Sequence, residues 1–147
     1  MTARVDDLTF LHLAQQLSRD EGRVAKLYRD DEGHPTIGIG FNLDAIGMPQ
    51  PVMDLWLKIL VTEIASEVYN AIPVYKDLSP ARQGALLNMA YTMGVLGVQT
   101  FTHMLVRLQQ QDWAGAAAAI RASKWGTSQA PDRAERVARQ IETDTWV

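Results

Sequence analysis

Residues 27–40, with the sequence LYRDDEGHPTIGIG, place three acidic residues directly before a glycine-rich stretch of alternating isoleucines. The partial alternation before this acidic run and the Gly- and Pro-bearing turn after it predict a β-hairpin or small meander. Glycine weakens a strand and often marks the close approach of a ligand or of another backbone segment. Gly38 and Gly40 therefore leave two interpretations open, the close approach of a ligand or two bulge glycines in a twisted hairpin, and the glycines alone favour the second.

The second strand of this hairpin is expected to have two unlike faces, because side chains along a strand alternate between sides of the sheet. The apolar set predicted to pack inward is Ile37, Ile39 and Phe41. The opposite face would carry Thr36 with the two glycines, leaving a shallow strip of bare backbone.

A helix is predicted just before the hairpin, from apolar residues spaced at close to helical period between Leu8 and Leu17. Asp6, Asp7 or Thr9 could cap its start, and Gly22 is placed to end it. Glu21 then falls in the last turn, where the negative end of the helix dipole disfavours a charged carboxylate. Position alone leaves two interpretations of Glu21 open: a solvated surface residue, or a carboxyl group that is meant to keep its proton.

The rest of the chain is predicted to be helical, and the fold class is therefore α+β. A long helix from Pro51 to Ala71 joins a small N-terminal lobe, about residues 12–60, to a larger all-helical lobe, about residues 61–147 plus the first helix. Both lobes belong to a single domain, 1–147. The further predicted helices cover residues 80–94, 100–110, 112–125 and 131–141.

Composition narrows the class of protein. The 147 residues include no cysteine and three scattered histidines, so we predict neither a metal site nor a cofactor. No apolar run reaches the roughly 18 residues of a membrane span, and no signal peptide is apparent, so we expect no stable membrane insertion. Residues 1–70 hold six basic and eleven acidic side chains, and residues 71–147 hold eight basic and six acidic ones. A protein that binds nucleic acid usually has a clear basic patch, so this distribution disfavours a nucleic-acid partner.

Three residues and their spacing carry a resemblance to a known family. Asp30 lies nine residues after Glu21, and Thr36 lies six residues after Asp30. The order of motifs around them is Glu-Gly, Asp, Glu-Gly and then Thr-Ile-Gly-Ile-Gly. This pattern resembles the active-site hairpin of the phage lysozymes, glycoside hydrolase family 24. The segments 73–94, 101–117, 123–137 and 143–146 follow in the order of that family, so that the resemblance covers roughly residues 10–146. It implies a lysozyme-like fold with its cleft between the two lobes.

The resemblance also implies roles for individual residues. Glu21 matches the proton donor, Asp30 the catalytic aspartate and Thr36 a threonine that helps to hold the attacking water. Asp31 leaves a register ambiguity, but Asp30 keeps the spacing to both other residues. The implied substrate-binding residues are Glu32, Gly40, Asn42, Asn88, Tyr91, Thr92 and Lys124, with Trp125 supporting the cleft. The implied ion pairs join Arg133 to Glu21 and Arg136 to Asp20, with Glu32 facing Lys124 across the cleft mouth.

Three positions depart from the family pattern. Phe41 stands where the family has a histidine, and Asn42 stands where it often has a leucine. Thr92 replaces a family glutamine on the wall of the cleft. These changes affect the expected sugar contacts but not the catalytic set.

Glycoside hydrolysis explains why two unlike carboxyl groups are needed, because one protonates the leaving oxygen while the other guides water or attacks carbon. If a water lies between Asp30 and the sugar, the two carboxyl groups should be about 6.5–9.5 Å apart and the anomer inverted. The resemblance implies a monomeric muramidase acting on the β-1,4 bond between N-acetylmuramic acid and N-acetylglucosamine in peptidoglycan. It would be an antibacterial endolysin held in the host cytoplasm until a phage-made membrane lesion, formed by a holin, releases it to the wall.

Other interpretations remain at this point. The same fold could serve as a cell-wall-binding module with weak or no catalysis, or as a lysozyme carried on the virion. The acids could also be a solvated hairpin in a structural or partner-binding helical protein. Loss of turbidity in a peptidoglycan suspension would separate the enzyme from both non-catalytic interpretations.

Overall fold

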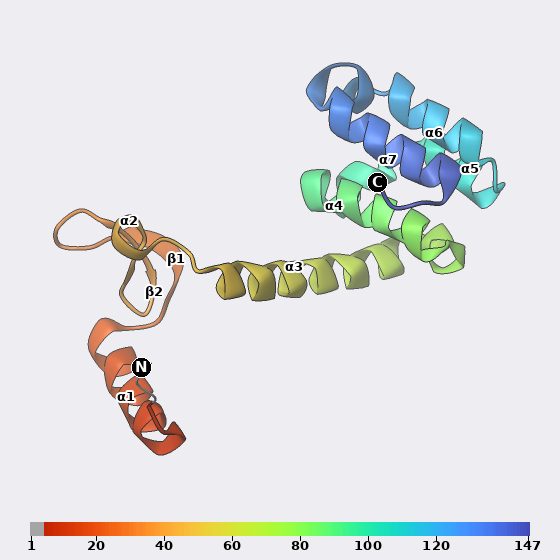
Figure 1. The fold of residues 1–147 in the computed structure, drawn as a ribbon. Helices are drawn as coiled ribbons and strands as arrows, with labels where there is room; N and C mark the ends of the chain where they lie inside the picture. Colours follow the sequence, from red (N-terminus) through yellow and green to blue (C-terminus); the bar gives the residue numbers. More distant parts are fainter. Residues whose placement is uncertain (1–4) are drawn as a thin grey trace. The chain divides into compact units, whose positions relative to one another are not determined.

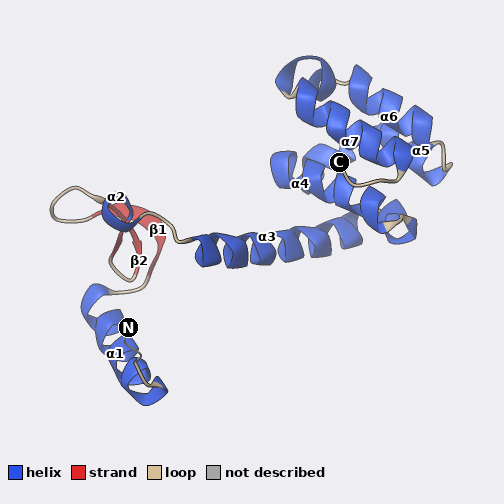
Figure 2. Cartoon of the chain, viewed as in Figure 1, coloured by secondary structure: helices blue, strands red, loops and turns tan. Residues whose placement is uncertain are grey.

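The computed structural model describes residues 5–147. By its internal contacts the chain divides into two compact units, Met1–Leu55 and Trp56–Val147. The strands lie only in the first unit and most helices in the second, so the predicted α+β class is confirmed (Figures 1 and 2). The boundary falls inside α3 (Gln50–Ala71), the predicted long helix. The placement of the first helix with the helical lobe stays a prediction.

The first unit opens with α1 (Asp7–Glu21), and both of its ends follow from local sequence. The Asp6 carboxylate caps the helix by accepting the backbone N–H of Thr9 at 2.9 Å. Gly22 ends it with a φ of +77°, a conformation that costs glycine little. Glu21 is thus the last helical residue, as predicted.

The hairpin is part of a three-stranded antiparallel sheet in the order β1-β2-β3. Its strands are β1 (Val24–Arg29), β2 (Pro35–Gly38) and β3 (Phe41–Asn42). Thr36 pairs with Tyr28 on one side and with Asn42 on the other, which makes β2 the central strand. The register of β1 shifts between Val24 and Tyr28, so the β1–β2 pairing is irregular there.

The predicted alternation of faces in the second strand was wrong. The chain turns back after Gly38, and Ile37 pairs with Phe41 across a three-residue turn. Gly38 and Gly40 have φ values of +70° and +64°, so the pair makes the turn and does not continue an extended strand. Phe41 is 48% exposed, and within residues 5–55 Thr36 is the one residue that is fully buried.

The second unit is a helical bundle with its own core. After α3, a 3₁₀ turn (Pro73–Asp77) leads into α4 (Pro80–Gln99), α5 (Thr102–Gln109), α6 (Trp113–Ala122), a π-helical turn (Trp125–Gln129) and α7 (Pro131–Thr143). The alanine-rich α6 packs closely on α5 and α7, and α7 also contacts α4 (Figure 1). The largest fully buried side chains are Ile72, Leu86, Met89, Met104, Leu108, Ile120 and Ile141. None of the helices in residues 5–147 combines the length and apolar character that crossing a bilayer requires.

Gly94 was predicted to end a helix and does interrupt one, since its φ of +74° breaks the helical path inside α4.

The end of α7 is held by a side chain from the start of α4. Arg82 donates from Nε to the carbonyl of Ile141 at 2.8 Å and pairs with Asp144 at 3.1 Å. Its guanidinium also lies 3.7 Å from the ring centroid of Trp113. One cation therefore ties α4, α6 and the end of α7 together.

Replacing Arg82 by alanine is expected to lower the free energy of unfolding by about 2–3 kcal/mol, because a hydrogen-bonded, 12% exposed cation and its aromatic stacking are lost together. Arg107→Ala is the matched control, since its pair with Asp112 is exposed and should contribute about 0–1 kcal/mol. Urea denaturation of both variants measures the difference. Equal losses would contradict the role given to Arg82.

Candidate active site

The carboxyl group of Glu21 lies against the turn between β2 and β3. A Cβ built on Gly40 would stand 2.6 Å from Oε2 of Glu21, closer than such atoms approach, and 3.1 Å from its Cδ. The end of α1 is thus brought to the hairpin, and a side chain at position 40 would have to displace this carboxyl group. The bare strip of backbone predicted at Gly40 was therefore wrong, because the Glu21 carboxyl group occupies the space beside this glycine.

Asp30 follows the last residue of β1 and its side chain closes the turn into β2. Oδ1 accepts the backbone N–H groups of Glu32 at 3.0 Å and of His34 at 2.8 Å. The backbone carbonyl of Asp30 accepts the N–H of Gly33 at 2.9 Å. The backbone N–H of His34 makes the largest contribution and lowers the pKa of Asp30 from its ordinary value of 3.8. Burial opposes this effect, and the N–H of Glu32 and the nearby imidazole lower the pKa further. Asp30 is therefore a fixed carboxylate at neutral pH.

Thr36 brings a hydroxyl group to this carboxylate. Its Oγ1 lies 3.4 Å from Oδ2 of Asp30 and 3.1 Å from the carbonyl oxygen of His34. A hydroxyl carries one hydrogen, which can be donated to one of these acceptors at a time, and two lone pairs that stay available as acceptors. The predicted pair of Asp30 and Thr36 is thus brought together, with Thr36 only 2% exposed.

His34 is a residue of this site that the sequence reasoning missed. Its Nδ1 lies 3.5 Å from Oδ2 of Asp30 and 3.7 Å from Oε2 of Glu32. This nitrogen is buried and makes no hydrogen bond with the described protein atoms. The sequence does place this titratable side chain four residues after Asp30, within a predicted tight turn. It was missed because the three histidines were considered only as possible metal ligands.

Three other predicted residues of the first unit have surroundings that the sequence did not reveal. Asn42 caps the short helix α2 (Leu43–Ile46), because its Oδ1 accepts the N–H of Ala45 at 3.0 Å. The side chain of Glu32 is 82% exposed and projects from the turn. The Asp20 carboxylate accepts from Nε of its neighbour Arg19 at 2.8 Å.

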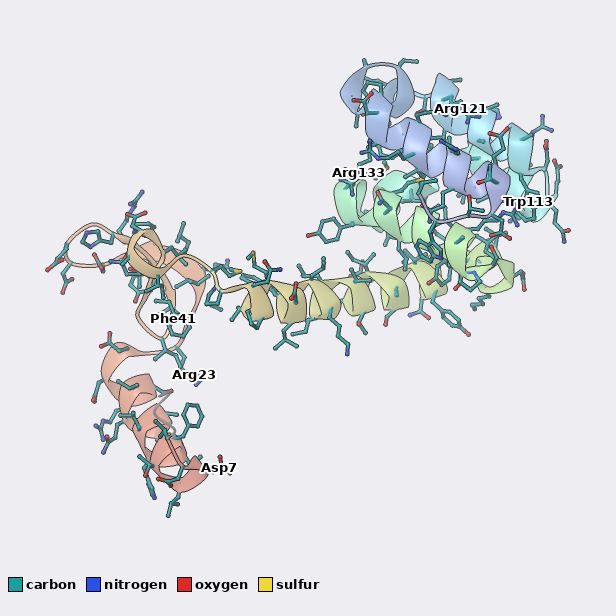
Figure 3. All side chains as sticks on the ribbon, in the orientation of Figure 1. Asp7, Arg23, Phe41, Trp113, Arg121 and Arg133 are labelled. Carbon is teal, nitrogen blue, oxygen red and sulfur yellow. The ribbon has the colours of Figure 1, made fainter. Side chains whose placement is uncertain are left out.

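The remaining predicted residues lie in the second unit. Arg133, labelled in Figure 3, lies near the start of α7. Its Nε donates to Oδ1 of Asn88 on α4 at 2.8 Å. Thr92 donates to the carbonyl of Asn88 at 3.1 Å, and Tyr91 is exposed. Arg136 lines a small cavity of about 220 Å³ together with Asn88 and Arg133.

Lys124 and Thr92 line a different and larger cavity of about 810 Å³, also within the second unit. The ion pairs predicted between the two units, Arg133 with Glu21, Arg136 with Asp20 and Glu32 with Lys124, stay predictions. Among residues 5–147 no group of three or more His, Asp or Glu side chains is placed to hold a metal ion.

The lowered pKa of Asp30 has a consequence for stability. Because its pKa is lower in the folded than in the unfolded state, the ionised carboxylate stabilises the fold above the unfolded-state value, and this contribution is lost as pH falls through the folded-state pKa. We expect a carboxyl ¹³C titration to place the midpoint of Asp30 below 3.8. His34→Gln should raise it only in part, since the backbone N–H bonds stay. A midpoint at or above 3.8 in the unaltered protein would contradict this account of the turn.

The family model described as phage lysozyme matches residues 18–139. The chain is 34% identical, over 94% of its length, to the pre-baseplate central spike protein Gp5 of Enterobacteria phage T4, of which the match covers 29%. It is 30% identical, over 90% of its length, to the probable T4-type lysozymes 1 and 2 of Dictyostelium discoideum, and covers 95% of each. These matches support a glycoside hydrolase of the muramidase type. The chain belongs to the phage lysozyme family.

Proposed function

We propose that the protein is an N-acetylmuramidase that hydrolyses the β-1,4 bond between N-acetylmuramic acid and N-acetylglucosamine in bacterial peptidoglycan. The observation that carries the proposal is the hydrogen-bonded pair of Asp30 and Thr36 in the same small unit as Glu21. A fixed carboxylate beside a hydroxyl group is suited to hold one water molecule. A second carboxyl group at a helix end is suited to supply a proton.

In this mechanism Glu21 gives its proton to the glycosidic oxygen as the bond from that oxygen to the anomeric carbon breaks. The water held by Asp30 and Thr36 forms the new bond to that carbon from the opposite face, and Asp30 accepts a proton from the water. The product then has an inverted anomeric configuration. No cofactor or metal ion takes part in these steps, and we propose that the enzyme acts as a monomer.

Digestion of purified peptidoglycan followed by mass analysis tests the reaction. New reducing ends on muramic acid are expected, and NMR during digestion should show the α-anomer first. Reducing ends on glucosamine, or anhydro ends, would require a different mechanism. A wall that sediments with the protein and stays intact would instead indicate a binding module.

Glu21→Gln and Asp30→Asn are each expected to lower the initial rate of turbidity loss by about 10²–10⁴-fold, since the proton donor or the water-holding carboxylate is removed. Asp31→Asn is the matched control, because Asp31 is the exposed neighbour that could exchange roles with Asp30 by a shift of one residue. It should keep most of its activity. A loss at Asp31 equal to that at Asp30 would overturn the register assigned here.

Gly40→Ala tests whether the close approach to Glu21 matters for function. Its added Cβ would displace the Glu21 carboxyl and would also be strained at a φ of +64°. Gly47→Ala has the same kind of strain at a φ of +61°, with nothing within 4 Å of the added atom. Both variants should lose about 1–2 kcal/mol of stability, but only Gly40→Ala should lose at least about tenfold in lytic rate, the effect of roughly 1.4 kcal/mol on the barrier. Equal lytic rates for the two variants would argue against this positioning role.

The biological setting follows from the same proposal. We propose that the protein is an endolysin that accumulates in the host cytoplasm and reaches the wall, for host lysis, through a phage-made membrane lesion. Expression in a bacterium should then leave culture density unchanged until the membrane is permeabilised with chloroform. The similarity to a spike protein supports a second candidate, a lysozyme carried on the virion. Detection of the chain in purified phage particles would favour that candidate.

A further inference from the structure

The imidazole of His34 lies beside the catalytic carboxylate, and no step of the proposed reaction uses it. The backbone of this residue already holds the site together: its N–H donates to Oδ1 of Asp30 at 2.8 Å, and its carbonyl accepts the Thr36 hydroxyl at 3.1 Å. Oδ1 also accepts the N–H of Glu32, so Oδ2 is the oxygen of Asp30 that is left to hold the water. The imidazole lies at this second oxygen, with Nδ1 3.5 Å from Oδ2.

The surroundings of Nδ1 decide which ring nitrogen carries the hydrogen. Nδ1 is buried without a hydrogen-bond partner among the described residues, and the two groups that face it are Oδ2 of Asp30 and, at 3.7 Å, Oε2 of Glu32. An unprotonated nitrogen would direct its lone pair at these two acceptors, whereas an N–H makes both contacts attractive. We infer that Nδ1 keeps its hydrogen and that the ring, whose side chain is 40% exposed, gains and loses its second proton at Nε2.

The other charged groups of the turn bear less strongly on the ring. The Glu32 side chain is 82% exposed and is screened by solvent, whereas the Asp30 side chain is 32% exposed. Asp31 is exposed, and Arg29 on β1 donates from Nη1 to a backbone carbonyl of the turn at 2.9 Å. In the described chain, no further carboxylate lies within 4 Å of the ring nitrogens. Asp30 is therefore the main partner of the imidazole.

We propose that His34 is a positioning residue for the hydrolytic water and that the charge of its ring regulates the reaction. In the neutral ring, the Nδ1–H dipole points at Oδ2 of Asp30 and holds the carboxylate in place, while the ring takes no proton from the water. A second proton at Nε2 places a positive charge beside Oδ2, which makes the carboxylate a weaker base toward the water. This inference rests on the proposed function, in which Asp30 accepts a proton from the water.

The pH dependence of the rate tests the regulation. Histidine changes charge at roughly pH 5–8, above the range of ordinary carboxylates. The activity is therefore expected to be complete above this range and to fall about three- to tenfold as pH decreases through it, because the charged ring weakens the base. The measurement is kcat on soluble peptidoglycan fragments at saturation. His12→Asn is the matched control, because His12 is exposed on α1, and it should leave this acid limb in place.

Two substitutions at position 34 separate the N–H donor from the charge. His34→Asn brings an amide N–H to about the position of Nδ1 and cannot become charged, so the acid limb should leave the histidine range while the maximum kcat stays within about twofold. His34→Gln brings its amide to about the position of Nε2, so the limb should also move, but the maximum kcat should fall about two- to fivefold. An acid limb that stays in the histidine range, or equal maximum rates in the two variants, would overturn the proposal.

The position of the ring hydrogen can be measured without catalysis. In the full ¹⁵N-labelled chain carrying Glu21→Gln, proton–nitrogen correlations within the ring should show the Nδ1–H form of His34 at alkaline pH, with the signals assigned by their loss in His34→Asn. A neutral ring that carries its hydrogen on Nε2 would overturn the proposal. A protein that releases no muramic acid ends from peptidoglycan would contradict the proposed function and this role together. Cleavage with an acid limb that His34→Asn does not move would refute the role of His34 alone.

Discussion

The carboxylate of Asp30 is the group on which the rest of the site depends. By accepting the N–H groups of Glu32 and His34, it closes the turn between β1 and β2 and so sets the register in which Thr36 pairs with Tyr28. The same hydrogen bonds stabilise the charged form of the carboxylate and lower its pKa. The same two hydrogen bonds therefore fix the turn and keep the Asp30 carboxylate charged. Because a neutral group accepts these N–H groups more weakly, neutralising Asp30 should loosen the turn that positions Thr36.

The two units are stabilised in different ways. The helical unit buries a continuous apolar core along α4 to α7, whereas the described part of the first unit buries only Thr36 fully. A segment of about fifty residues with so little buried surface depends on capped helix ends, strand pairing and hydrogen-bonded turns. The catalytic candidates lie in that unit, in accordance with the tendency of functional groups to lie on turns held by local contacts.

Much of this arrangement could be predicted where local rules decide it. The capping residue Asp6 and Gly22 allowed both ends of α1 to be predicted. Helical periodicity predicted the helices from α3 to α7. The alternation predicted after Thr36 was wrong because a period of two assumes an uninterrupted strand. Two glycines at positive φ turn the chain back there instead. Sequence pattern alone cannot separate these cases, since glycine permits both conformations.

Contacts between residues far apart in sequence were beyond the reach of such rules. The tie that Arg82 makes to the end of α7 joins residues 59 and 62 positions apart, and nothing in the local pattern marks it. His34 and the cap made by Asn42 are local, but they depend on turn geometry that composition does not reveal. The resemblance to the phage lysozymes supplied the catalytic candidates themselves, which spacing alone left open.

The different surroundings of the two carboxyl groups connect this structure to acid–base chemistry. Asp30 accepts two backbone N–H groups and lies near an imidazole and a hydroxyl group, all of which favour a charged acceptor. Glu21 lies at the carbonyl end of α1, and its carboxyl group lies against the backbone of Gly40. Hydrolysis of a glycoside requires one group that stays ionised and one that gives a proton, and unlike environments are how a protein separates these roles. The segment from α1 to β3 carries both carboxyl groups, and the hydrogen bonds that hold Asp30 in its charged form are local to its turn.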